Sequence, residues 1–203
     1  VTDTLAEVLS AGNSSGGTDI SMTAGDDIVT ASAGTNNLRL GSNAGAAIAS
    51  GGNYNTVVGD LAGQAVTTGD YNTALGYNAM AAATTGSNNV GIGGLALDAL
   101  TTASDNTAVG MQAFTTLTSG TANVGLGFRA GYQATAESNI TAIGYSTLFA
   151  ANPGSNTTAV GTEALKSATG NDSTAVGYRA LFSNTTGSSN TAVGRESSGS
   201  VTT

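Results

Sequence analysis

Apolar and polar positions alternate with a period of two in short stretches, and the same stretch recurs along the chain. "NTAVG" stands at residues 106–110 and again at 190–194, with variants "NVGLG" at 123–127, "TTAVG" at 157–161 and "STAVG" at 173–177. Such alternation is typical of a β-strand. Gly and Asn recur every few residues and disfavour a helix. We therefore expect one short strand in each copy.

The glycine that closes each stretch gives the period of the repeat. Successive closing glycines are separated by 18, then six times by 17, then by 16 and 17 residues. A 17-residue repeat therefore runs from about residue 37 to residue 203. The closing glycines, for which we expect tight turns with positive φ, are Gly41, Gly59, Gly76, Gly93, Gly110, Gly127, Gly144, Gly161, Gly177 and Gly194.

An aliphatic residue stands directly before each closing glycine, and a β-branched residue stands two positions earlier in most copies. One such unit cannot bury an apolar face alone, but stacked units can. We therefore predict an all-β solenoid, roughly 45–50 Å long at about 4.8 Å per strand. Its expected core ladder is Val58, Leu75, Ile92, Val109, Leu126, Ile143, Val160, Val176 and Val193.

Asparagine recurs four or five residues before the closing glycine. Asn tolerates left-handed geometry and bonds backbone groups in turns, and stacked Asn side chains can form an amide ladder. The expected ladder is Asn55, Asn72, Asn89, Asn106, Asn123, Asn139, Asn156 and Asn190.

Residues 1–36 lack the repeat and form a separate segment before the solenoid of residues 37–203. Thr4 and Glu7 fit a capping box and Gly12 fits a helix stop, which predicts a short helix. "GTDISMTAGDDIVTA" alternates like strands. The segment is interpreted either as a cap over the open end of the solenoid or as a docking segment that joins chains.

Composition and charge exclude several function classes. The net charge of −8 disfavours nucleic-acid binding, and no apolar run approaches the length needed for membrane insertion. The absence of His and Cys removes the usual catalytic triads and zinc sites. Asp26 and Asp27 are a pair of carboxylates such as glycosidases use, but adjacent residues of a strand would point to opposite faces and could not act on one sugar. We predict neither an enzyme nor a cofactor or metal.

Two motifs resemble a dinucleotide fingerprint, namely "GIGGLA" at 91–96 and "GLGFRA" at 125–130. Every copy of the repeat nearly fits this pattern, and no strand–helix–strand unit surrounds either motif. They are interpreted as part of the repeat.

Two columns after the closing glycine are candidates for surface contacts. The position directly after it holds Tyr77, Phe128, Tyr145 and Tyr178. Stacked aromatic side chains there would bind sugars or other flat surfaces, or pack in a seam between chains or at a corner of the solenoid. The following position holds Arg129, Ser146, Glu163, Arg179 and Glu196. The last three lie in neighbouring copies and alternate in sign, which predicts a cross-strand ladder of charges.

The unit "NTAVGMQAFTTLTSGTA" at 106–122 resembles the Hep/Hag head repeats of trimeric autotransporter adhesins, and more closely the 17-residue repeats of bacteriophage tail-fibre proteins. "GYRALFSNTTGSSNTAVG" at 177–194 is similar to the same consensus, and "TLAEVLSAGNSSGGTDI" at 4–20 to an N-terminal segment of such fibres. The resemblance implies a left-handed parallel β-roll, three chains side by side, and a place on a virion or otherwise outside the cell.

The leading functional hypothesis is a structural shaft of a phage tail fibre used in host attachment. Its expected partners are two further copies of the chain, other fibre or tail proteins at the ends, and a receptor or glycan on the host surface. The alternatives are a cell-surface trimeric adhesin, an extracellular filament subunit made of single chains, and an ice-binding solenoid. Paired threonines such as Thr84–Thr85 and Thr101–Thr102 motivate the last of these.

Overall fold

The structure is a computed structural model that describes residues 32–150 and 153–198. The short helix expected at Thr4–Gly12, and most of the expected cap or docking segment, lie outside the described residues.

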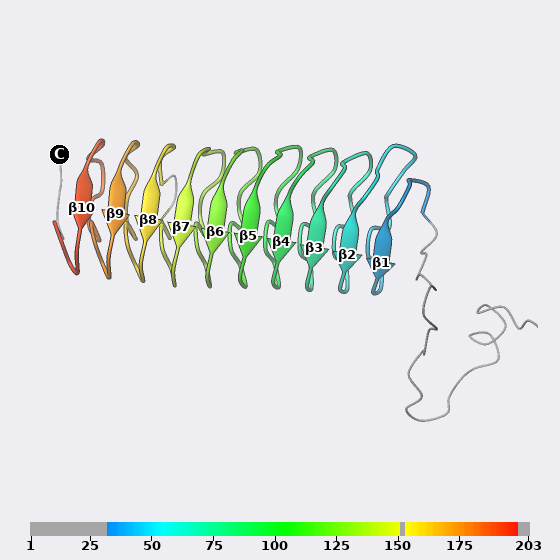
Figure 1. Cartoon of the computed structure of the whole chain (residues 1–203), viewed down its shortest axis with the longest axis horizontal. Helices are drawn as coiled ribbons and strands as arrows, with labels where there is room; N and C mark the ends of the chain where they lie inside the picture. Colours follow the sequence, from blue (N-terminus) through cyan, green and yellow to red (C-terminus); the bar gives the residue numbers. More distant parts are fainter. Residues whose placement is uncertain (1–31, 151–152, 199–203) are drawn as a thin grey trace, which may run out of the picture.

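Ten parallel strands form one sheet in sequence order, β1 to β10, so the described chain is an all-β solenoid without a helix (Figure 1). Each strand pairs in register with the next; Thr107, Ala108 and Val109 pair with Val124, Gly125 and Leu126. The structure confirms the predicted fold class. The strands are β1 Leu38–Leu40, β2 Thr56–Val58, β3 Thr73–Leu75, β4 Val90–Ile92, β5 Thr107–Val109, β6 Val124–Leu126, β7 Thr141–Ile143, β8 Thr158–Val160, β9 Thr174–Val176 and β10 Thr191–Val193.

The closing glycine after each strand has φ between 123° and 138° in all ten turns of the solenoid, which we call rungs. Glycines also stack closely from rung to rung. A Cβ on Gly110 would lie 2.4 Å from the carbonyl oxygen of Gly127. Both the backbone conformation and the close approach therefore require a residue without a side chain.

Three further positions in each rung have left-handed backbone although most of them are not glycine. They lie five before, two after and four after the closing glycine; in one rung they are Asp105 (φ 62°), Gln112 (φ 60°) and Phe114 (φ 49°). Left-handed backbone costs a non-glycine residue about 1–2 kcal/mol. The N–H group of each residue bonds a carbonyl of a neighbouring rung, at 3.1, 2.9 and 2.9 Å respectively. Hydrogen bonds between rungs thus stabilise left-handed turns that the sequence alone does not predict.

The predicted core ladder is wrong, because the aliphatic residue before each glycine faces outward. Leu75 is 44% exposed, Leu126 45% and Val193 70%. Successive strand residues point to opposite faces, so in β2–β10 the central residue, such as Val57 or Ala108, is the one that is buried. The rest of the interior comes from residues three, four and seven positions after the glycine.

Large and small residues compensate for each other inside the solenoid. Phe114 is fully buried, and a Cβ added to Gly125 or Gly131 in the next rung would lie 2.7 or 2.1 Å from its ring. Met80 meets Gly91 in the same way, with 2.8 Å from that Cβ to the Met80 side chain. The centres of β4 and β6 are therefore Gly91 and Gly125, because a larger side chain of the adjacent rung already fills the space.

A buried amide ladder runs along one corner of the solenoid. The backbone N–H of Asn106 donates to Oδ1 of Asn89 at 3.0 Å, and the Asn106 Nδ2 donates to the carbonyl oxygen of Gly120, also at 3.0 Å. The structure confirms the ladder over five of the predicted positions, which are Asn55, Asn72, Asn89, Asn106 and Asn123.

The ladder does not include Asn139 and Asn156. These residues lie five rather than four positions before the glycine, in a left-handed column, with φ 59° and 55°. Ile140 and Thr157 occupy the buried position in their rungs. The backbone N–H of Ile140 still donates to Asn123 Oδ1 at 2.9 Å. The ladder ends there, because the Ile140 side chain has no amide oxygen to accept a bond from the next rung.

Candidate functional site

The sheet presents one continuous outward face, made of the first and last residue of each strand β1–β10; we call this the sheet face. It holds a column rich in Thr and a column of Val, Ile and Leu, and none of these residues is charged. At about 4.8 Å per strand the sheet face is about 45 Å long. The main apolar part of this face is the last residue of each strand, which is the aliphatic column expected in the core.

The paired threonines lie in turns, away from the sheet face. Thr84 Oγ1 donates to the carbonyl oxygen of Thr101 at 3.1 Å, and Thr101 Oγ1 donates to that of Thr118 at 3.0 Å. The first hydroxyl of each pair therefore bonds the next rung.

The predicted aromatic column is exposed and only partly continuous. Phe128 and Tyr145 stack with ring centroids 5.5 Å apart. Tyr77 is separated from them by Gly94 and Met111, and Tyr178 by Thr162, at the same position of intervening rungs. The structure thus brings together two of the four predicted residues; Tyr145 is 54% exposed.

A second aromatic column, which the sequence analysis missed, lies five positions after the closing glycine. Tyr132 and Phe149 stack there with ring centroids 5.0 Å apart and planes inclined by 5°. Phe182 occupies the same column further along. The spacing of four residues in Phe128–Tyr132, Tyr145–Phe149 and Tyr178–Phe182 is the signal that would have revealed this column.

An arginine lies over both rings of its own rung in two places. The guanidinium carbon of Arg129 is 4.9 Å from the Phe128 ring centroid and 5.2 Å from that of Tyr132. In the second place, Arg179 is 5.2 Å from Tyr178 and 5.0 Å from Phe182. Such cation–π contacts fix the arginine side chains in place.

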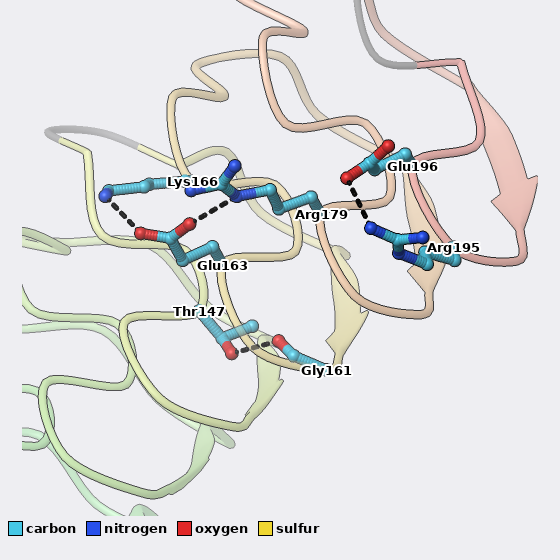
Figure 2. Close-up of polar contacts among 7 residues, drawn as sticks. All are labelled: Thr147, Gly161, Glu163, Lys166, Arg179, Arg195 and Glu196. Carbon is cyan, nitrogen blue, oxygen red and sulfur yellow. Dashed lines mark hydrogen bonds and ion pairs between the residues drawn. The ribbon is translucent and has the colours of Figure 1, made fainter.

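The predicted charge ladder is present at Glu163 and Arg179. Figure 2 shows the Glu163 carboxylate between two cations, with Lys166 Nζ at 2.6 Å from Oε1 and Arg179 Nε at 2.6 Å from Oε2. The ladder does not continue as a close pair to Glu196, which instead lies 3.4 Å from Arg195 of its own rung.

The two cations perturb the acid between them. The hydrogen bond from Lys166, followed by the one from Arg179, lowers the pKa of Glu163 against the opposing effect of partial burial. The hydrogen bond to Glu163 raises the pKa of Arg179 in turn. Glu163, Lys166 and Arg179 therefore form an ion-pair cluster with one surplus positive charge at neutral pH.

Two predicted absences concern metals and membranes. The described residues contain no group of three or more His, Cys, Asp and Glu side chains that could hold a metal ion. No helix in the described part of the chain is long and apolar enough to cross a membrane. The dinucleotide-like motif at 125–130 is a strand centre and a turn, with Gly125 against Phe114.

No known family model, curated protein or solved structure matches the chain. We therefore infer function from the repeat pattern and from the outer faces of the solenoid.

Proposed function

We propose that this chain is a structural subunit of a fibre shaft, in which three copies pack side by side through their sheet faces. The observation that carries the proposal is the sheet face itself. It holds an exposed or half-buried aliphatic side chain in every rung of the described solenoid and contains no charge to keep a neighbouring copy away.

Physical chemistry favours a covered sheet face. Parallel sheets are ordinarily covered on both faces, whereas here one face contacts no other part of the described chain. A continuous exposed apolar strip usually marks an interaction site. Because all ten strands are in register, every rung offers the same contact, and weak contacts add along the length of the shaft.

The resemblance of the repeat to phage tail-fibre sequences supports a role in host attachment on a virion. In this role the shaft is a rigid connection between tail proteins at one end and a receptor-binding part or glycan at the other. A cell-surface trimeric adhesin uses the same architecture and is the alternative.

The sheet-face interface is tested with a charged substitution. Val109→Asp places a carboxylate in the middle of the sheet face, where a trimer would bring three of them close together in an apolar seam. Thr102→Asp is the matched control, since Thr102 is exposed in a turn of an adjacent rung. Sedimentation velocity is expected to show assembly lost in Val109→Asp and kept in Thr102→Asp; equal behaviour of the two variants would argue against the seam.

The coding sequence downstream of this chain distinguishes a place on a virion from a place on a cell surface. A downstream self-cleaving chaperone domain is expected for a phage fibre. A downstream membrane anchor would favour the adhesin instead.

A further inference from the structure

The columns one, two and five positions after the closing glycine form one corner of the solenoid, where most of the basic residues gather. Four of the five Lys and Arg residues of this acidic chain lie in these columns, namely Arg129, Lys166, Arg179 and Arg195. The same corner carries both aromatic columns. Their arrangement differs between two otherwise similar rungs, and this difference points to a ligand.

The two rungs share an aromatic–Arg–x–x–aromatic sequence. One contains Phe128, Arg129 and Tyr132, and the other contains Tyr178, Arg179 and Phe182. In both, the arginine has left-handed backbone, with φ 55° and 54°, and lies over both rings. In both, its Nε donates to the residue at the same column of the preceding rung.

The two rungs differ in the group that accepts the hydrogen bond from the arginine Nε. Arg179 Nε donates to the carboxylate of Glu163 at 2.6 Å, so a negative charge lies directly against this guanidinium. Arg129 Nε donates to the neutral amide oxygen of Gln112 at 2.8 Å. Within residues 32–150 and 153–198, no carboxylate lies within ion-pair distance of Arg129. Arg129 is thus a positioned cation whose charge the described protein does not neutralise.

The aromatic rings around Arg129 are arranged in two stacked pairs. Phe128 stacks on Tyr145 and Tyr132 stacks on Phe149, so one face of each ring is covered. Arg129 lies over Phe128 and Tyr132 as well. Aromatic edges carry positive electrostatic potential and attract negatively charged oxygens, as the guanidinium does. The combination suits an anionic group better than a neutral one.

We propose that Phe128, Arg129, Tyr132, Tyr145 and Phe149 bind an acidic saccharide, whose carboxylate or phosphate pairs with the Arg129 guanidinium. We call this the Arg129 site. A single cation in a chain of net charge −8 suits one acidic group on an otherwise neutral sugar, and not a polyanion such as nucleic acid. The tyrosine hydroxyl groups provide hydrogen bonds for sugar hydroxyls. This proposal rests on the proposed function, because it names the class of surface glycan that the shaft would contact.

Isothermal titration calorimetry on the full chain tests the Arg129 site. The probes are a trisaccharide of one galacturonic acid and two galactose units for the carboxylate, mannose 6-phosphate for the phosphate, and galactotriose as the neutral sugar. We expect one site per chain for at least one acidic probe, with affinity at least tenfold above that for galactotriose. Failure of both acidic probes to bind would overturn the proposal, as would equal binding of a short poly-glutamate peptide.

Charge variants separate the site from general surface charge. Gln112→Glu copies the Glu163–Arg179 pair and is expected to weaken acidic-probe binding at least tenfold, as is Arg129→Gln. Arg195→Gln removes the same charge elsewhere on this corner and is expected to leave affinity within twofold. Glu163→Gln frees Arg179 from its acidic partner and is expected to raise the stoichiometry to two sites per chain. Unchanged binding in Gln112→Glu, or one site in Glu163→Gln, would contradict the assignment.

Mass in solution, measured on the same samples, keeps the two proposals apart. A trimer that binds neither acidic probe overturns the Arg129 site and leaves the fibre proposal standing. A monomer that binds as expected overturns the fibre proposal alone.

Discussion

At the scale of single residues, the closing glycine Gly93 and its neighbour Gly94 differ in how much room surrounds them. Gly93 has φ 124°, and a Cβ there would lie 2.7 Å from both the carbonyl carbon and the carbonyl oxygen of Gly110. Its neighbour Gly94 has ordinary φ, and the nearest atom to an added Cβ is the Tyr77 carbonyl oxygen at 3.9 Å. The two positions make a matched pair.

We predict that Gly93→Ala destabilises the protein by at least about 2 kcal/mol, because it combines left-handed strain with a backbone clash. Gly94→Ala is expected to change stability by less than about 0.5 kcal/mol. Denaturant unfolding of both variants at one protein concentration measures the difference. Similar stabilities for the two would show that the glycine stack is not a constraint.

Glu163 gives a prediction about pH. Its pKa is lowered in the folded protein, so the stabilisation from its ion pairs is present above the ordinary value of 4.5 and is lost as pH falls through the folded pKa. The stability difference between the wild type and Glu163→Gln should therefore shrink as pH falls from 7 to 3. Denaturant unfolding across that range measures it, and a difference that grew toward low pH would contradict the assigned ion pairs.

At the scale of the structural element, the period of the strands could be predicted from sequence, but the face that they bury could not. Alternation placed Thr107, Ala108 and Val109 on a strand correctly. It also suggested that Val109 is inside, since aliphatic residues are usually buried. The side chain of Phe114, which enters from a left-handed turn, leaves room at the next strand centre for Gly125 alone. Non-glycine left-handed residues leave no clear signal in the sequence, so this contact was not foreseeable.

The pairing of Phe114 with Gly125 predicts strong coupling between the two positions. Gly125→Ala alone should cost about 1–3 kcal/mol, because its Cβ meets the Phe114 ring. In the double variant with Phe114→Leu the new methyl group should be accommodated, as Ala175 is beside the buried Leu165 of the preceding rung. A double-mutant cycle is expected to give a coupling free energy of at least about 1 kcal/mol. Additive effects would rule out this packing.

The candidate site could be predicted only in part, because the repeat pattern shows which residues share a column but not which side chains meet. Phe128, Tyr145 and Tyr178 were found because they recur one position after the glycine. Arg129 was noted only as part of a charge column. Its distinctive environment depends on Gln112, which lies 17 residues away in the chain and 2.8 Å away in space. Only a stack in register brings these two residues together.

At the scale of the whole molecule, the described solenoid is a rod with one uncharged sheet face and one corner that carries the two aromatic columns and four of the five basic residues. Short strands in register give the rod its length, and buried Asn, Ala and Gly positions hold its rungs together. Neither outer feature is needed to close a single solenoid. We therefore propose that the sheet face serves assembly and the corner serves recognition.

The mass of the unmodified full chain in solution tests the central claim most directly. Light scattering on the eluted peak of a size-exclusion column, repeated over a range of concentrations, is expected to give three times the mass of one chain. A chain that stays monomeric across that range would contradict the three-chain shaft. Long polymers without a trimer would contradict it as well, because they would indicate single chains stacked end to end.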